Sequence, residues 1–253
     1  TKPWTLMHSN HVLVFDVGGE YGHFRKFNTT TSPLTYSIPP RTALIGMIGA
    51  ILGIEREIGI GKFKKGQVPL ADLLAPDKAD LAVQILNPTS KVMMAFNLLN
   101  TKTSFFNIEN RTQIEFELLK NPKFRVFIRW ENTALFTQLE EKLSNKHSDF
   151  TVSLGLSQHL ADVSYVGKYA IRKMTENDAH TSVISAVKLN ALDPLNPIQF
   201  NQEFKYISDT MPIYMTSERI VKEYAEVIVE ANGKPILVKS DHVFKVEAFG
   251  NIQ

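Results

Sequence analysis

The chain has 253 residues, of which 43% are hydrophobic and 21% are charged, and it contains no cysteine. These proportions are typical of a folded globular protein and exclude wholesale disorder. The lack of cysteine excludes a disulfide framework, a thiolate zinc site, an iron–sulfur cluster and a cysteine nucleophile. A formal net charge of +2 is too mild for a protein that grips a polyanion with its whole surface, so any nucleic-acid contact must be local.

The membrane and targeting signals are weak. The longest apolar run, from Ala43 to Ile54, is interrupted by three glycines and is shorter than the ~20 residues that a membrane-spanning helix needs. Residues 1–10 lack the cationic start and apolar stretch of a secretory signal. We therefore expect a cytoplasmic protein with no membrane partner.

The first part of the chain alternates strand and helix patterns. The β-branched and aromatic run His11–Val17 predicts a buried strand, and a long loop follows it as far as Pro40. Helical periodicity then predicts a first helix that ends near Ile54. Further strands are expected at Leu81–Leu86, Val92–Leu99 and Lys123–Trp130, a second helix at Thr133–Lys146, and another extended segment at Phe150–Leu156.

This order matches the split β-α-β arrangement of ferredoxin-like folds, which include RNA-recognition domains. We predict an α+β fold with a ferredoxin-like (RRM-like) β-α-β-β-α-β domain over residues 1–168. An inserted thumb is expected at about 97–121, and a smaller β-rich domain over 169–253. In that second domain, Asn232-Gly233 favours a type I′ turn and predicts a hairpin between Glu223–Ala231 and Pro235–Lys239.

The loop after the first strand is the sharpest local feature. From Tyr21 to Ile54 its charged side chains are all cationic, and aromatic residues lie between them. Cations neutralise phosphates and aromatic rings stack on unpaired bases, which is how single-stranded RNA is bound. In the alternative interpretation, Phe24 and Tyr36 fill the core while the cations are merely solvated. The candidate RNA contacts here are Tyr21, His23, Phe24, Arg25, Lys26, Tyr36 and Arg41.

Two later segments also carry candidate contacts. The long excursion at 97–121 holds the adjacent aromatics Phe105 and Phe106 and suits an arm that wedges between bases or grips a neighbouring subunit; the alternative is a disordered surface insertion. Near Gly155, a histidine and an aspartate are compatible with acid–base or metal chemistry, but a structural histidine is the preferred interpretation. The candidate RNA contacts in these segments are Asn100, Lys102, Arg111, Gln113, Ser157, Gln158, His159 and Lys168.

Three stretches of the sequence resemble a known family. The first joins Phe15-Asp16-Val17 and His23-Phe24-Arg25-Lys26 to Tyr36-Ser37-Ile38-Pro39-Pro40-Arg41-Thr42-Ala43-Leu44-Ile45-Gly46. The second runs from Asn110-Arg111-Thr112-Gln113 to Val126, and the third is Leu154 to Val163. Across positions 11–167 the chain resembles the CRISPR-associated Cas-five family of repeat-associated RNA-binding proteins with ferredoxin-like folds, and it is most similar to the type I-B branch.

The resemblance implies a subunit of the Cascade surveillance complex that holds the 5′ handle of the guide RNA (crRNA) and caps the filament of backbone subunits. It implies that the thumb corresponds to the inserted arm, and that the handle-gripping surface corresponds to Tyr21–Lys26, Tyr36, Arg41 and Ser157–His159. The implied partners are the crRNA, a backbone subunit, a large subunit and target DNA near its PAM end. No metal or organic cofactor is implied.

Two alternatives remain beside this non-catalytic role. In the type I-C branch of the family, a tyrosine, a lysine and a histidine cut precursor RNA without metal, and His23, Lys26 and Tyr36 are close enough in sequence to suggest the same chemistry. The chain is then a metal-independent endoribonuclease. A scaffold that binds only proteins is the other alternative.

Overall fold

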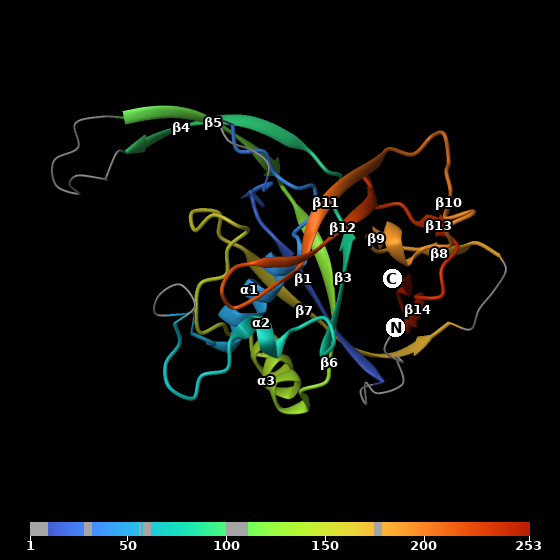
Figure 1. Cartoon of the computed structure of the whole chain (residues 1–253), viewed down its shortest axis with the longest axis horizontal. Helices are drawn as coiled ribbons and strands as arrows, with labels where there is room; N and C mark the ends of the chain where they lie inside the picture. Colours follow the sequence, from blue (N-terminus) through green and yellow to red (C-terminus); the bar gives the residue numbers. More distant parts are fainter. Residues whose placement is uncertain (1–9, 28–31, 56, 58–61, 100–110, 175–178) are drawn as a thin grey trace.

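The computed structural model describes residues 10–27, 32–55, 57, 62–99, 111–174 and 179–253. Its main element is a nine-stranded sheet in the order β10-β13-β8-β15-β14-β7-β1-β6-β3 (Figure 1). These strands are β1 (His11–Gly18), β3 (Ala79–Ile85), β6 (Lys123–Trp130), β7 (Asp162–Lys173), β8 (Thr181–Val183), β10 (Ile198–Gln199), β13 (Ile236–Val238), β14 (Phe244–Val246) and β15 (Gly250–Ile252).

Smaller elements surround this sheet. The helices are α1 (Arg41–Leu52), α2 (Leu70–Leu73) and α3 (Thr133–Ser144), with a 3₁₀ turn, η2, at Leu189–Ala191. One three-stranded sheet contains β11 (Tyr206–Met215), β12 (Val221–Glu230) and β9 (Val187–Lys188), in that order. The other contains β2 (Tyr21–Gly22), β5 (Arg111–Lys120) and β4 (Lys91–Leu99).

Strand β1 is buried on both faces because it lies inside the large sheet, between β6 and β7. Leu13, Phe15 and Val17 belong to the main core, which α1 and α3 cover, whereas Val12 and Val14 belong to a second cluster on the opposite face. A strand that is buried on both faces is expected to read as a continuous apolar run. This explains why the β1 sequence does not alternate between apolar and polar residues.

The order β7-β1-β6-β3, with α1 and α3 as the two crossing helices, is the predicted ferredoxin-like unit, and the α+β fold class is confirmed. The predicted last strand is wrong, however. Phe150–Leu156 forms only an isolated bridge between Ser153 and Leu160, and β7 supplies the fourth strand. Val152 and Leu154 are buried, so they produce an apolar alternation without a sheet ladder.

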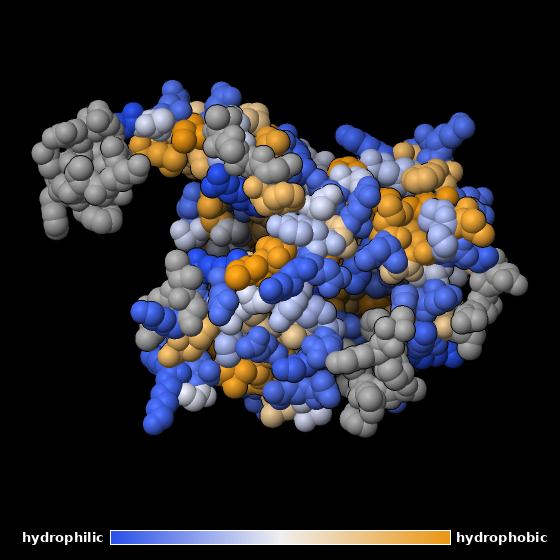
Figure 2. Space-filling view, viewed as in Figure 1, coloured by the Kyte–Doolittle hydropathy of each residue, from blue (hydrophilic) through white to orange (hydrophobic). Residues whose placement is uncertain are grey.

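The described part of the predicted insertion comprises the last residues of β4 and the whole of β5, which pair as an antiparallel ladder. Strands β4 and β5 pair antiparallel from Lys91↔Leu119 to Leu99↔Arg111 and extend away from the body of the molecule (Figure 1). Figure 2 shows apolar side chains along this arm, among polar ones. Ile114, Phe116 and Leu118 recur at every second position of β5, a strand that is absent from the predicted elements. The positions Asn100, Lys102, Phe105 and Phe106 lie outside the described residues.

The predicted Asn232-Gly233 hairpin is also wrong. Strand β12 pairs with β11 and β9, whereas β13 pairs with β10 and β8 in the large sheet. The buried carboxylate of Glu230 accepts hydrogen bonds from the backbone N–H groups of Asn232 (2.9 Å) and Lys234 (2.8 Å). Of the two turn residues only Gly233 has a positive φ, of 75°, whereas a type I′ turn needs two.

The expected domain boundary at 168/169 lies inside β7, and the large sheet continues beyond it through the pairing of β7 with β14. Backbone hydrogen bonding therefore joins the two halves of the chain. Within the described part of the chain, no helix has the length and apolar character needed to cross a membrane.

Candidate nucleic-acid interface

The loop after β1 is fixed to the base of the β4–β5 hairpin. His23 is the main attachment: its backbone N–H donates to the carbonyl of Leu154 (2.9 Å), and its Nδ1 lies 2.8 Å from the carbonyl oxygen of Glu117 in β5. The imidazole also packs edge-on against Phe116, with 5.3 Å between ring centroids. The loop, the hairpin and the segment around Leu154 thus form one continuous surface.

Gly155 allows the Ser157–His159 turn to lie against this loop. Its φ is +92°, and a Cβ at this position would lie 1.8 Å from the carbonyl oxygen of His23, so the close approach requires glycine. His159 is buried, and its ring centroid lies 6.3 Å from that of Tyr21. Burial lowers the pKa of both His23 and His159, so both rings are neutral at neutral pH. The exposed side chains of the turn are those of Ser157 and Gln158.

Two of the predicted stacking residues are in the core. Phe24 is 3% exposed and packs edge-on against Phe124, and Tyr36 is 2% exposed. Burial raises the pKa of the Tyr36 phenol. The alternative interpretation, in which these two rings fill the core beneath the loop, is therefore the correct one for their position.

The loop cations have different surroundings. Lys26 forms an ion pair with Asp209 of β11, and its ammonium lies 5.7 Å from the centroid of the Tyr36 ring. Asp209 is buried, so this pair connects the loop to the second half of the chain. Arg25 has an exposed side chain, and its backbone forms an isolated bridge with Thr35. Of these two cationic side chains, that of Arg25 is the more exposed.

Arg41 is the first residue of α1 and has a structural environment. Its Nη2 donates to the carbonyls of Leu74 and Ala79, both at 2.8 Å, and thereby joins the start of α1 to the segment before β3. Burial lowers its pKa to about 10, so the side chain remains charged at neutral pH. Arg41 was predicted as an RNA contact, and these bonds give it a structural role instead.

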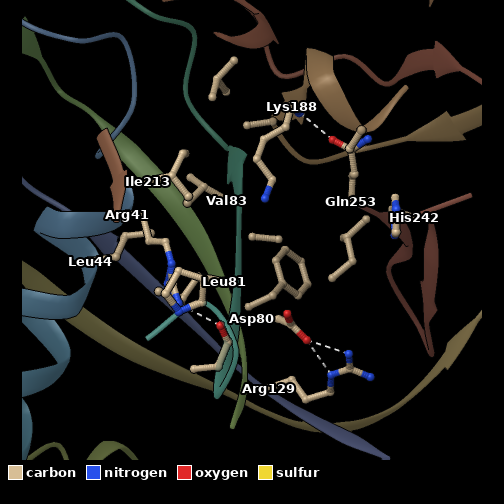
Figure 3. Close-up of a pocket in the computed structure, with 18 of the residues that line it drawn as sticks. Arg41, Leu44, Asp80, Leu81, Val83, Arg129, Lys188, Ile213, His242 and Gln253 are labelled. Carbon is tan, nitrogen blue, oxygen red and sulfur yellow. Dashed lines mark hydrogen bonds and ion pairs between the residues drawn. The ribbon is translucent and has the colours of Figure 1, made fainter. Parts of the chain in front are cut away.

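Arg41 also lines a cavity of about 390 Å³ between α1, β3 and the β9–β11–β12 sheet (Figure 3). Its walls are mostly apolar. Asp80 accepts from Nε (2.9 Å) and Nη2 (2.6 Å) of Arg129, and the amine of Lys188 points into the cavity. Loss of solvation lowers the pKa of Lys188. No sequence pattern could have indicated this cavity because its walls come from segments throughout the chain.

The remaining candidates are not part of the same surface. Lys168 pairs with Glu140 of α3 at 2.9 Å and lies over the Phe136 ring. Arg111 and Gln113 are exposed at the outer end of β5. At about 3.4 Å per residue, Gln113 is roughly 24 Å along the strand from the hairpin base. Among the residues that the structure describes, no three histidine, aspartate or glutamate side chains gather as a metal site requires.

Comparison with known proteins identifies the family. A family model described as "CRISPR-associated protein (Cas_Cas5)" matches residues 12–219. A search of curated proteins gave no match.

Solved structures share the fold. A CRISPR protein from Archaeoglobus fulgidus has a TM-score of 0.52 at 15% identity, covering 96% of this chain and 97% of that one. A chain of a CRISPR RNA-guided surveillance complex has a TM-score of 0.51 at 14% identity, covering 88% and 91%. A chain of the type III-B Cmr-beta complex bound to cognate target RNA and AMPPnP also has a TM-score of 0.51 at 14% identity, covering 90% and 86%. Because the family model spans most of the sequence and the fold agrees with it, the chain belongs to the Cas-five family of CRISPR-associated proteins.

Proposed function

We propose that the chain is a subunit of a type I CRISPR effector complex, of the I-B Cascade kind, that binds the 5′ handle of the crRNA and caps the filament of backbone subunits. The observation that carries the proposal is the surface formed by the loop after β1 and the Ser157–His159 turn. These segments are held together by the His23–Leu154 hydrogen bond and the close approach at Gly155. We refer to this surface as the handle surface.

The handle surface offers the groups that unpaired RNA requires. Arg25 supplies an exposed guanidinium for a phosphate, and Ser157 and Gln158 supply exposed hydrogen-bonding groups. Tyr21 is half-buried, and its ring borders His159. The deeper residues Phe24 and Tyr36, by contrast, hold the loop in place from below.

The β4–β5 hairpin supports the role in assembly. Met93 and Leu99, on one face of β4, are 53% and 47% exposed, and Leu98, on the other face, is 42% exposed. Exposed apolar side chains of this size are typical of a surface that a partner covers. In the proposal, the neighbouring backbone subunit covers these apolar side chains of β4. Arg111 and Gln113 on β5 contact the crRNA at the same interface. The large subunit, and target DNA near its PAM end, are further partners in the proposal.

We propose binding rather than RNA cleavage as the role of this surface. A base that removes the 2′-hydroxyl proton must come within hydrogen-bond reach of the RNA. The Nε2 atom of His23 is buried, Lys26 is paired with Asp209, and the Tyr36 hydroxyl is buried. These surroundings disfavour the endoribonuclease alternative for this trio.

The test is binding of fluorescently labelled single-stranded repeat RNA by the full chain, in EDTA, over a series of salt concentrations. Arg25→Ala should weaken binding and reduce the slope of log affinity against log salt by about 0.7, the value for one phosphate contact on a single strand. Lys245→Ala, which removes an exposed cation from β14, is the matched control. Equal affinities for the two variants would contradict the handle surface, and trimmed RNA would support the endoribonuclease.

A further inference from the structure

An exposed pair of aromatic rings lies beside the handle surface. Phe27, at the end of the described part of the loop, is 61% exposed, and Tyr224 of β12 is 42% exposed. Their ring centroids are 5.0 Å apart, and the ring planes are inclined by 49°. Two large aromatic side chains that remain this accessible while touching each other form an apolar surface open to solvent, in which each ring has its own plane.

The position of this pair is fixed by buried contacts beneath it. Lys26, the neighbour of Phe27, is paired with Asp209, which lies on β11 next to β12. The phenol of Tyr36 is close enough for both Asp209 and Tyr224 to raise its pKa, in addition to the larger effect of burial. The two rings are therefore held by the fold, which reduces the entropy lost when a ligand binds.

Arg25 precedes Phe27 by two residues, and Lys222 precedes Tyr224 by two residues on β12, at the point where the pairing with β11 is irregular. Both cationic side chains are exposed. Glu226, on the same side of the strand as Tyr224, accepts a hydrogen bond from the Ser208 hydroxyl (2.6 Å). An exposed aromatic ring with an exposed cation two residues away in the chain suits a nucleobase with its adjoining phosphate.

We propose that Phe27 and Tyr224 form a stacking platform for one unpaired base of the bound RNA. The inference rests on the proposed function, and it adds that the second half of the chain contributes directly to RNA binding. Stacking on aromatic rings is tolerant of base identity, because every base has a π-face. The platform therefore contributes affinity with little sequence preference.

The experiment compares ring replacements in the full chain, using the same labelled repeat RNA. Phe27→Leu and Tyr224→Leu keep apolar bulk but remove the flat ring, whereas Tyr224→Phe keeps the ring. Phe200→Leu is the matched control, since Phe200 is also 61% exposed and contacts a tyrosine, Tyr206, at 4.9 Å. We expect each of the first two variants to bind RNA about 5- to 150-fold more weakly, the range for the loss of one stacked base. Tyr224→Phe and Phe200→Leu should retain wild-type affinity.

Photocrosslinking with 5-iodouridine-substituted RNA adds a direct readout, because crosslinked peptides should contain Phe27 or Tyr224. If wild-type chain binds RNA but the two leucine variants bind as well as Phe200→Leu, the platform is wrong while the proposed function stands. If the leucine variants bind RNA normally but fail to assemble with other subunits, the pair is a protein contact and the inference is overturned. If wild-type chain binds no repeat RNA, both proposals fail.

Discussion

Gly155→Ala should separate the two halves of the handle surface. The added methyl group would lie 1.8 Å from the carbonyl oxygen of His23, whereas real Cβ contacts are essentially never under 3.0 Å. The backbone must therefore move by about 1 Å, which strains the bond from the His23 N–H to Leu154. The left-handed φ of +92° adds a conformational cost of about 1–2 kcal/mol for alanine. With about 1 kcal/mol for this weakened hydrogen bond, the total is about 2–3 kcal/mol.

Gly66→Ala is the control for this prediction. Gly66 also has a positive φ, of +83°, but among the described residues no atom beyond its chain neighbours lies within 4 Å of a Cβ placed there. Gly66→Ala should therefore lower the free energy of unfolding only by the conformational cost of a left-handed alanine, about 1–2 kcal/mol. Urea unfolding gives both free energies, and RNA titration should show weaker binding for Gly155→Ala alone. If the two variants are destabilised equally, the close approach does not hold the Ser157–His159 turn in place.

Three further changes test the interior around this surface. Arg41→Lys should lower the free energy of unfolding by about 1.5–3 kcal/mol, as measured in urea, because one ammonium cannot reproduce the two charged hydrogen bonds to backbone carbonyls; an unchanged midpoint would show that the bonds contribute nothing. Burial lowers the pKa of His23 and His159 in the folded state, so the unfolded chain takes up protons first as the pH falls. Stability should thus be complete above about pH 6.5 and decrease below it, and urea midpoints that do not vary with pH would contradict this. Asp209→Asn should lower the free energy of unfolding by about 1–3 kcal/mol, between the values for surface and buried ion pairs. If Lys26 and Asp209 act as a pair, adding Lys26→Met to this variant should lower the free energy of unfolding little further.

The short-range patterns of the sequence were sufficient for most of the ferredoxin-like unit. Periodicity located β1, α1, β6 and α3 to within a few residues, because each element exposes or buries side chains at its own spacing. The same reasoning failed at Phe150–Leu156. Its apolar residues are buried by a turn that contains a left-handed glycine, and periodicity does not distinguish such burial from that of a strand.

The candidate site depended more strongly on tertiary structure. The sequence located the loop after β1 and the Ser157–His159 segment, since both concentrate polar, cationic and aromatic groups. It left open whether Phe24 and Tyr36 face RNA or the core, because a buried ring and a stacking ring have the same composition.

The chain's own sequence thus determined most elements of the ferredoxin-like unit and the resemblance to its family. Only the tertiary structure decided which charges and rings are available at the surface. Lys26 is neutralised by Asp209, and Phe27 meets Tyr224, through contacts between residues far apart in the chain. Local periodicity carries no information about such pairs, because they exist only after the β11–β12 sheet packs against the loop.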